Sequence, residues 1–138
     1  MSRSGYTDDG DNWAMIKWRG AVASAIRGRR GQAFLSEMLT ALEVLSARRL
    51  ISGEFVKDGE VCAMGAVGLH RGVAGLHEVD PYDRETIAST FGIPSALAAE
   101  IMYENDEGGS YWREETPERR WARVRAWVAS KIKGEVST

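Results

Sequence analysis

The chain has 138 residues, of which 43% are hydrophobic and 28% are charged; this composition is typical of a globular protein and excludes a disordered or collagen-like chain. A single cysteine excludes an internal disulfide and a zinc site built from several cysteines, and no apolar run reaches the roughly 20 residues of a membrane span. With 18 basic and 20 acidic residues, the net charge of −2 disfavours a histone-like mode of nucleic-acid binding.

The length predicts one domain, because globular domains usually contain about 100–200 residues. We expect a flexible N-terminal segment at 1–11, a single globular helical domain at 12–134 and a flexible C-terminus at 135–138. Hydrophobic periodicity predicts a mainly α fold (α+β), with five to six helices packed around one core and a single β-hairpin.

Two helices are predicted in the first third of the domain. The first spans 12–26, begins at Asn12 as N-cap, and is expected to turn one apolar face toward the core. That face is expected to contain Trp13, Ile16, Ala21, Val22, Ala25 and Ile26. After a basic turn at 28–31, a second helix is predicted over 32–48, where apolar residues recur every three or four positions.

The hairpin is predicted from Asp58-Gly59, which lies between two short β-prone runs at 54–57 and 60–62. An Asp-Gly pair in this position favours a type I′ turn, in which both central residues have positive φ. The small residues at 63–69 then predict a short helix packed close to a neighbouring element.

Residues 84–103 are predicted to form two helices with the spacing of a DNA-binding helix-turn-helix. Ala88 would let the helices cross closely, Gly92 would make the turn, and Ile101 would lock the second helix. That helix carries Glu100 and runs into further acidic residues, which suit a phosphate backbone poorly. The alternatives are a tight helix pair in the core, a DNA-binding pair, and a pair that recognises a protein.

The last helix is predicted over 117–133, with Thr116 as N-cap and Pro117 in the first turn. Before it, 104–115 is predicted to be an acidic loop, whose match to a calcium-binding EF-hand loop is poor because Gly108 occupies a ligand position. The glycine-rich segments match neither a phosphate loop nor a dinucleotide fingerprint. We therefore expect no metal and no other cofactor.

Cys62, the single thiol, is predicted where a strand meets a helix N-terminus, a position that suits a nucleophile. A cysteine hydrolase would take its base from His70 or His77, since these are the only histidines. The alternative is a buried structural cysteine, which the apolar neighbours of Cys62 favour.

Charge is unevenly distributed, because 119–133 contains six basic residues and no acidic one. Four of the five tryptophans lie in the two terminal helices, which indicates that these helices pack together or against one shared core. If they are neighbours, their basic residues form one surface for an acidic protein face or a nucleic-acid backbone. The candidate partner-binding residues are Arg19, Arg27, Arg29, Arg30, Arg123 and Arg125, followed by Glu104, Asp106 and Glu107. In the alternative, the arginines pair with the acidic 100–118 stretch and both are neutralised.

Several runs of the sequence carry a resemblance to a known family. They are WRGAVASAIRG at 18–28 with RGQ at 30–32, DGEVCAMGAVG at 58–68, YENDE at 103–107, and TPERRW at 116–121 with RAWV at 125–128. Over nearly the whole chain they resemble an uncharacterised family of small proteins carried by tailed bacteriophages and prophages. The resemblance implies a phage product made in the host bacterial cytoplasm. Because the family has no assigned activity, the resemblance implies no catalytic residue.

These observations favour a small non-enzymatic phage accessory protein that binds a host or phage protein. Inhibition of a bacterial defence complex, in the manner of an anti-CRISPR protein, is one specific form of this hypothesis. The first alternative is a helix-turn-helix-like DNA-binding regulator, and the second is a cysteine hydrolase that uses Cys62. Nucleic acid is an alternative partner, no membrane partner is expected, and the oligomeric state is left open.

Overall fold

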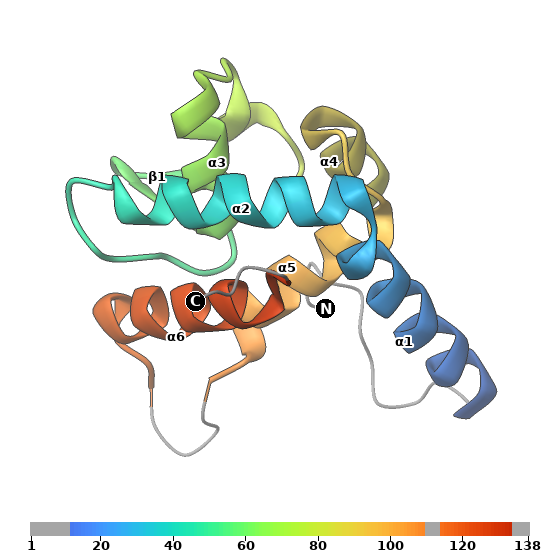
Figure 1. Cartoon of the computed structure of the whole chain (residues 1–138). Coiled ribbons are helices and arrows are strands. Elements are labelled where there is room, and N and C mark those ends of the chain that lie inside the picture. Colours follow the sequence, from blue (N-terminus) through green and yellow to red (C-terminus); the bar gives the residue numbers. More distant parts are fainter. Residues whose placement is uncertain (1–11, 110–113, 134–138) are drawn as a thin grey trace.

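The computed structural model describes residues 12–109 and 114–133. This part of the chain contains six α-helices and one two-stranded hairpin (Figure 1). The prediction of a mainly α fold with a single β-hairpin is confirmed. The segments predicted to be flexible, 1–11 and 135–138, lie outside the described residues. The elements are α1 (Asn12–Arg27), α2 (Arg29–Glu43), β1 (Val56–Lys57), β2 (Glu60–Val61), α3 (Ala63–Arg71), the 3-10 turn η1 (Leu76–Glu78), α4 (Arg84–Phe91), α5 (Ser95–Glu107) and α6 (Pro117–Lys131).

Helices α1 and α2 meet at an elbow, and α1 projects away from the rest of the molecule (Figure 1). The elbow consists of Gly28, whose backbone is extended between the two helices. Helix α2 begins and ends earlier than predicted, so Arg29 and Arg30 open the helix instead of forming a turn. Arg48 lies beyond its end, where the guanidinium stacks 4.8 Å from the ring centre of Trp121, a tertiary contact that the helical period did not reveal.

The prediction that Trp13 and Ile16 face the core is wrong, because 65% and 61% of these residues are exposed. The core is instead contacted from the other side of the helix, through three residues in the C-terminal half of α1: Val22, Ala25 and Ile26. At 100° per residue, positions 13 and 16 lie about half a turn away from position 22. Both sides of α1 are therefore apolar, and the sequence pattern did not distinguish them.

The hairpin turn has positive φ at both Asp58 (53°) and Gly59 (80°), which confirms the predicted type I′ geometry. The strands pair antiparallel in a short ladder. Helix α3 packs so closely beside this hairpin that a Cβ atom on Gly65 would lie 2.0 Å from the carbonyl oxygen of Phe55. The prediction of a helix with small residues at a close contact is thus confirmed.

Helix α5 lies at the centre of the fold and packs against α1, α3, α4 and α6. Its buried residues are Ala96, Leu97, Ala98, Ala99, Ile101, Met102 and Asn105. Helix α6 packs on α2 and α5, with Trp121, Val124 and Val128 buried and Thr116 accepting the backbone N–H of Arg119 as N-cap. The terminal helices α1 and α6 therefore meet a shared core, which confirms one of the two predicted arrangements.

Candidate functional site

Two of the candidate arginines are neutralised by acidic neighbours. Arg123 donates from Nε to Glu115 at 2.6 Å and from one terminal nitrogen to the carbonyl oxygen of Glu104 at 2.6 Å, so it ties the end of α5 to the segment before α6. Arg125 forms an ion pair with Glu43 of α2. The predicted alternative of pairing with the acidic 100–118 stretch therefore holds for Arg123, whereas Arg125 is neutralised by an acid outside that stretch.

The acidic candidates form the last turns of α5, so the prediction of a loop beginning at residue 104 is wrong. Glu104 lies 3.7 Å from Arg123, and Asp106 accepts the backbone N–H of Gly53 at 3.1 Å. Glu107 is exposed. Burial, together with the neighbouring Glu100 carboxylate, raises the pKa of Glu104 against the opposing effect of Arg123. These contacts tie the last turns of α5 to α6 and to the segment around Gly53, so Glu104 and Asp106 both have partners within the fold.

Asn105 is a structural residue that sequence reasoning missed. It is 1% exposed and is the only buried polar residue among the described ones. Its side-chain oxygen accepts the N–H of Ala63 at 3.0 Å, and its amide donates to the carbonyl oxygen of Ile51 at 2.9 Å and to Asp106 at 2.9 Å. It thus joins α5, the first turn of α3 and the 51–53 segment, and its position in an acidic run gave no signal of this role.

The other candidate arginines remain exposed. Arg19, Arg27, Arg29 and Arg30 are all exposed, and among the described residues none has an acidic partner. Two lysines join them, because Gln32 donates to the carbonyl oxygen of Lys131 at 2.9 Å and accepts the N–H of Lys133 at 2.8 Å. We name the surface formed by Arg27, Arg29, Arg30, Lys131 and Lys133 the basic elbow.

The arginines in the first turn of α2 lie next to the partial positive charge of the helix N-terminus, which is electrostatically unfavourable. A helix N-terminus carries a partial positive charge and is stabilised by acidic residues. Helix α2 has no acidic residue in its first turn, its N-cap Gly28 provides no side-chain hydrogen bond, and Arg29 and Arg30 occupy the first two positions. This arrangement disfavours the helix and concentrates positive charge at the elbow.

The helix-turn-helix spacing corresponds to a tight helix pair. Gly92 adopts the left-handed conformation at φ 72°, and Ile93 donates to the carbonyl oxygen of Ala88 at 3.0 Å. Helix α5, which would have to enter the major groove, is instead packed against four other helices. A recognition helix must present an open face to the bases, so this geometry favours the core-pair alternative.

Cys62 is 0% exposed and caps the N-terminus of α3, where its sulfur accepts the N–H of Gly65 at 3.4 Å. Both histidines that could serve as a base, His70 and His77, are exposed on the surface. A nucleophile must reach its substrate, and a thiol enclosed by core side chains does not. The geometry favours the structural alternative for Cys62.

We expect the thiol of Cys62 to resist labelling by an aromatic disulfide reagent in the folded protein, because no path leads from solvent to the sulfur. In guanidinium chloride the same reagent should react at the rate of a free thiol. The absorbance of the released thiolate measures both rates. Fast stoichiometric labelling of the folded protein would show that Cys62 is accessible and would return the hydrolase alternative to consideration.

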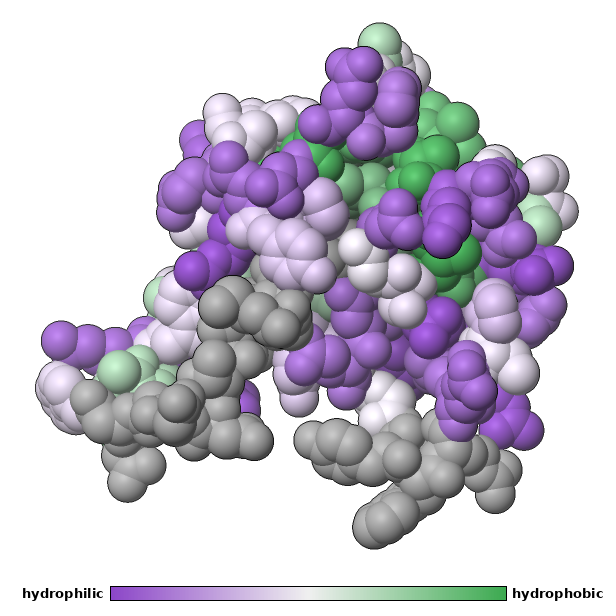
Figure 2. All heavy atoms as spheres, turned by 180° about the vertical axis from the view of Figure 1, so that it is seen from behind, coloured by the Kyte–Doolittle hydropathy of each residue, from purple (hydrophilic) through white to green (hydrophobic). Residues whose placement is uncertain are grey.

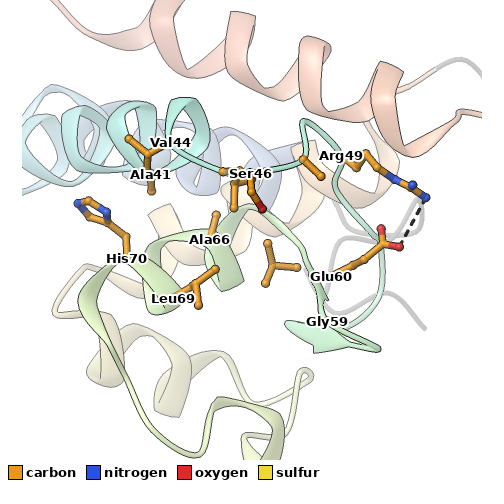
Figure 3. A pocket seen from close by; sticks show the side chains of 12 residues that line it. Ala41, Val44, Ser46, Arg49, Gly59, Glu60, Ala66, Leu69 and His70 are labelled. Atoms are coloured by element: carbon orange, nitrogen blue, oxygen red, sulfur yellow. Dashed lines mark ion pairs between the residues drawn. The ribbon is translucent and has the colours of Figure 1, made fainter.

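A shallow groove of about 310 Å³ lies between the end of α2, the hairpin and α3 (Figure 3). Its rim carries two exposed apolar residues, Val44 (62%) and Leu69 (63%), while Arg49 and Glu60 pair at 3.5 Å along one side. Figure 2 shows hydrophobic residues gathered in the upper part of the rear face, surrounded by hydrophilic ones. The groove offers space for apolar side chains, and its groups suited to acid–base chemistry are His70 and Glu60, the second of which pairs with Arg49.

No group of three or more histidine, cysteine, aspartate or glutamate residues within 12–109 and 114–133 is placed to hold a metal ion. None of the helices in this part of the chain has the length and apolar character needed to cross a membrane. Comparison of the chain with protein-family models, curated proteins and solved structures finds no match. The candidate site is therefore defined by its geometry, and the strongest candidate is the basic elbow.

Two ion pairs are expected to make the fold sensitive to acid. Hydrogen bonds from Arg71 and Arg123 lower the pKa of Glu37 and Glu115, respectively, below the ordinary value of 4.5. A carboxyl whose pKa is lowered by folding stabilises the fold above its unfolded pKa, and this contribution is lost as the pH falls through the folded value. At pH values below 4.5 we expect the urea concentration at the midpoint of unfolding to decrease. The decrease should be smaller in the double variant Glu37→Gln/Glu115→Gln.

Urea titrations followed by circular dichroism across this pH range test the expectation. The double variant should begin less stable at neutral pH, because both ion pairs are lost, and should show the flatter profile on acidification. If the stability of the double variant depended on pH as steeply as that of the parent, other carboxyl groups would dominate the loss of stability in acid.

Proposed function

We propose that this chain is a non-enzymatic binding protein that engages an acidic surface of a protein partner through the basic elbow and the adjoining face of α1. The observation that carries the proposal is the placement of Arg29 and Arg30 in the first turn of α2, exposed and without acidic partners among the described residues. A residue that opposes the fold locally without an internal compensation is typical of a functional position.

The surroundings of the elbow support the same proposal. Arginine and tryptophan are the residues most enriched at energetically dominant positions of protein interfaces. Trp13 and Ile16 are exposed on α1, the helix that leads into the elbow, so apolar and basic groups lie on one projecting element. A nucleic-acid backbone offers phosphates and few matching apolar contacts, whereas an acidic protein surface offers both kinds of partner group.

The resemblance to small phage proteins gives this proposal its context. A phage accessory protein of this kind would bind a host or phage macromolecule in the bacterial cytoplasm, and a bacterial defence complex is one specific target. Binding alone suffices for such inhibition, which agrees with the proposal that the chain has no catalytic role.

The test compares two charge reversals in matched positions. Arg29→Glu and Arg119→Glu each replace an exposed arginine in the first turn of a helix, α2 or α6. Because an acidic residue there suits the helix dipole, each variant should be about 0.3–1 kcal/mol more stable than the parent. Tagged forms are used to capture partners from bacterial lysate with and without nuclease, followed by mass spectrometry.

We expect a stoichiometric protein partner that survives nuclease, is retained by Arg119→Glu and is lost by Arg29→Glu. Loss of binding together with a gain in stability separates a contact residue from a structural one. Recovery of nucleic acid alone, or of partners that disappear with nuclease, would replace the proposal with nucleic-acid binding. Equal capture by both variants would show that the elbow is not the contact.

A further inference from the structure

Helix α1 carries a second apolar face that points away from the body of the protein. Trp13, Ile16 and Gly20 are exposed along it, and Ala23 is partly buried. These positions are spaced by three, four and three residues, which is the a/d spacing of a coiled-coil helix. We name Trp13, Ile16, Gly20 and Ala23 the outward seam.

The heptad register separates the outward seam from the face that holds α1 to the protein. With Trp13 and Gly20 at a positions, the buried Val22 and the core-contacting Ala25 occupy the c and f positions on the far side of the helix, and Ile26 meets the core from the flanking g position. The exposed members of the seam, Trp13, Ile16 and Gly20, are therefore not needed for packing α1 onto the described fold. Their apolar side chains are available to another helix.

The shape of the seam suits close helix packing. A Cβ atom added to Gly20 would meet nothing within 4 Å, so the helix surface is open at the centre of the seam. Trp13 and Ile16 stand on one side of this low point, and small residues at such positions let a second helix approach closely. A partner helix would place a large side chain over Gly20 and pack its apolar stripe against Trp13 and Ile16.

The charges beside the seam determine which helix fits. Lys17 and Arg19 occupy the flanking e and g positions, and the whole stretch 12–36 contains no acidic residue. Residues at e and g pair across a coiled-coil interface, and opposite charges there set partner choice. A second copy of α1 would offer no acidic residue to Lys17 or Arg19 and would add its own positive charge to the interface, which disfavours a second copy as the partner.

We propose that the outward seam docks an acidic amphipathic helix of a partner protein, with glutamate or aspartate residues facing Lys17 and Arg19. The proposal rests on the function proposed above and specifies the partner's contacting segment. The same helix would extend along α1 toward Arg27 at the next a position and so reach the basic elbow.

Two synthetic helical peptides of equal length test this docking. Both carry leucine at every a and d position; one has glutamate and the other lysine at every e and g position. Fluorescence anisotropy of the labelled peptides measures binding to the full chain. We expect the glutamate peptide to bind at least about tenfold more tightly than the lysine peptide, and Lys17→Glu/Arg19→Glu to reverse this preference.

The apolar contacts are tested with matched pairs of exposed residues. Trp13→Ala/Ile16→Ala should weaken binding of the glutamate peptide by about tenfold or more, whereas Val44→Ala/Leu69→Ala, in the α2–α3 groove, should leave it unchanged. All four residues are more than half exposed, so neither variant is expected to unfold the protein.

Three results would overturn the inference. The first is equal binding of the two peptides, or equal loss in the two alanine pairs. The second is a dimer of the chain in sedimentation that Trp13→Ala/Ile16→Ala dissolves, which would assign the seam to a second copy. The third is binding to anionic lipid vesicles that the same variant abolishes. If the peptides fail this test but capture of a protein partner from lysate still depends on Arg29, the proposed function remains supported and only the docking of a helix on the seam is wrong.

Discussion

The variant Gly31→Ala is expected to lose about 3 kcal/mol of unfolding free energy, although alanine is normally the better helix residue. A Cβ atom at position 31 would lie 1.8 Å from the carbonyl oxygen of Ala25, at the place where α1 and α2 cross behind the elbow. The obstructing atom belongs to backbone, so relief requires α1 to move as a whole, and overpacking of this kind costs more than the helix propensity of alanine returns.

Gly20→Ala is the matched control, since Gly20 also lies inside a helix and a Cβ there would meet nothing within 4 Å. This variant should gain about 0.5–1 kcal/mol. Urea unfolding followed by tryptophan fluorescence measures both changes. A Gly31→Ala protein as stable as the parent would show that the two helices are not in close contact. A destabilised but folded Gly31→Ala protein should also lose its captured partner, because the direction of α1 sets the geometry of the basic elbow.

Replacing Asn105 with alanine is expected to reduce the unfolding free energy by about 2–4 kcal/mol and to lower the melting temperature by about 10 °C. The side chain is buried and satisfies both the N–H of Ala63 and the carbonyl oxygen of Ile51. Its removal leaves these two backbone groups without their partner in the buried interior, and the desolvation of each is no longer offset.

Asn105→Asp separates the two halves of this bond network. An aspartate keeps the acceptor for Ala63, at the first turn of α3, but loses the donor to Ile51 and places a second carboxylate next to Asp106. We expect this variant to be at least as unstable as Asn105→Ala at neutral pH and to recover part of its stability on acidification, as protonation removes the buried charge. Differential scanning calorimetry at two pH values measures both effects. A small loss in both variants would show that water replaces the amide.

The packing of α6 decides which of its charged residues are paired within the fold and which remain exposed. Arg123 and Arg125 belong to the same basic helix as Arg119, yet the first two are held by Glu115 and Glu43 while the third remains exposed. Sequence position alone did not separate Arg125 from Arg119, because the acid that neutralises Arg125 is Glu43 of α2, far away along the chain. A charge pattern locates a basic helix, and only packing decides which of its charges are available to a partner.

The sequence by itself determined the elements whose causes are local. Asp58-Gly59 specified a type I′ turn, Gly92 ended α4 in the left-handed conformation, and Thr116 with Pro117 began α6, because backbone conformation and capping depend on residues a few positions apart. Tertiary structure alone decided that Trp13 faces outward and that Asn105 lies in the core. Those outcomes depend on where α1 leaves the protein and on backbone groups from distant segments, which helical periodicity does not encode.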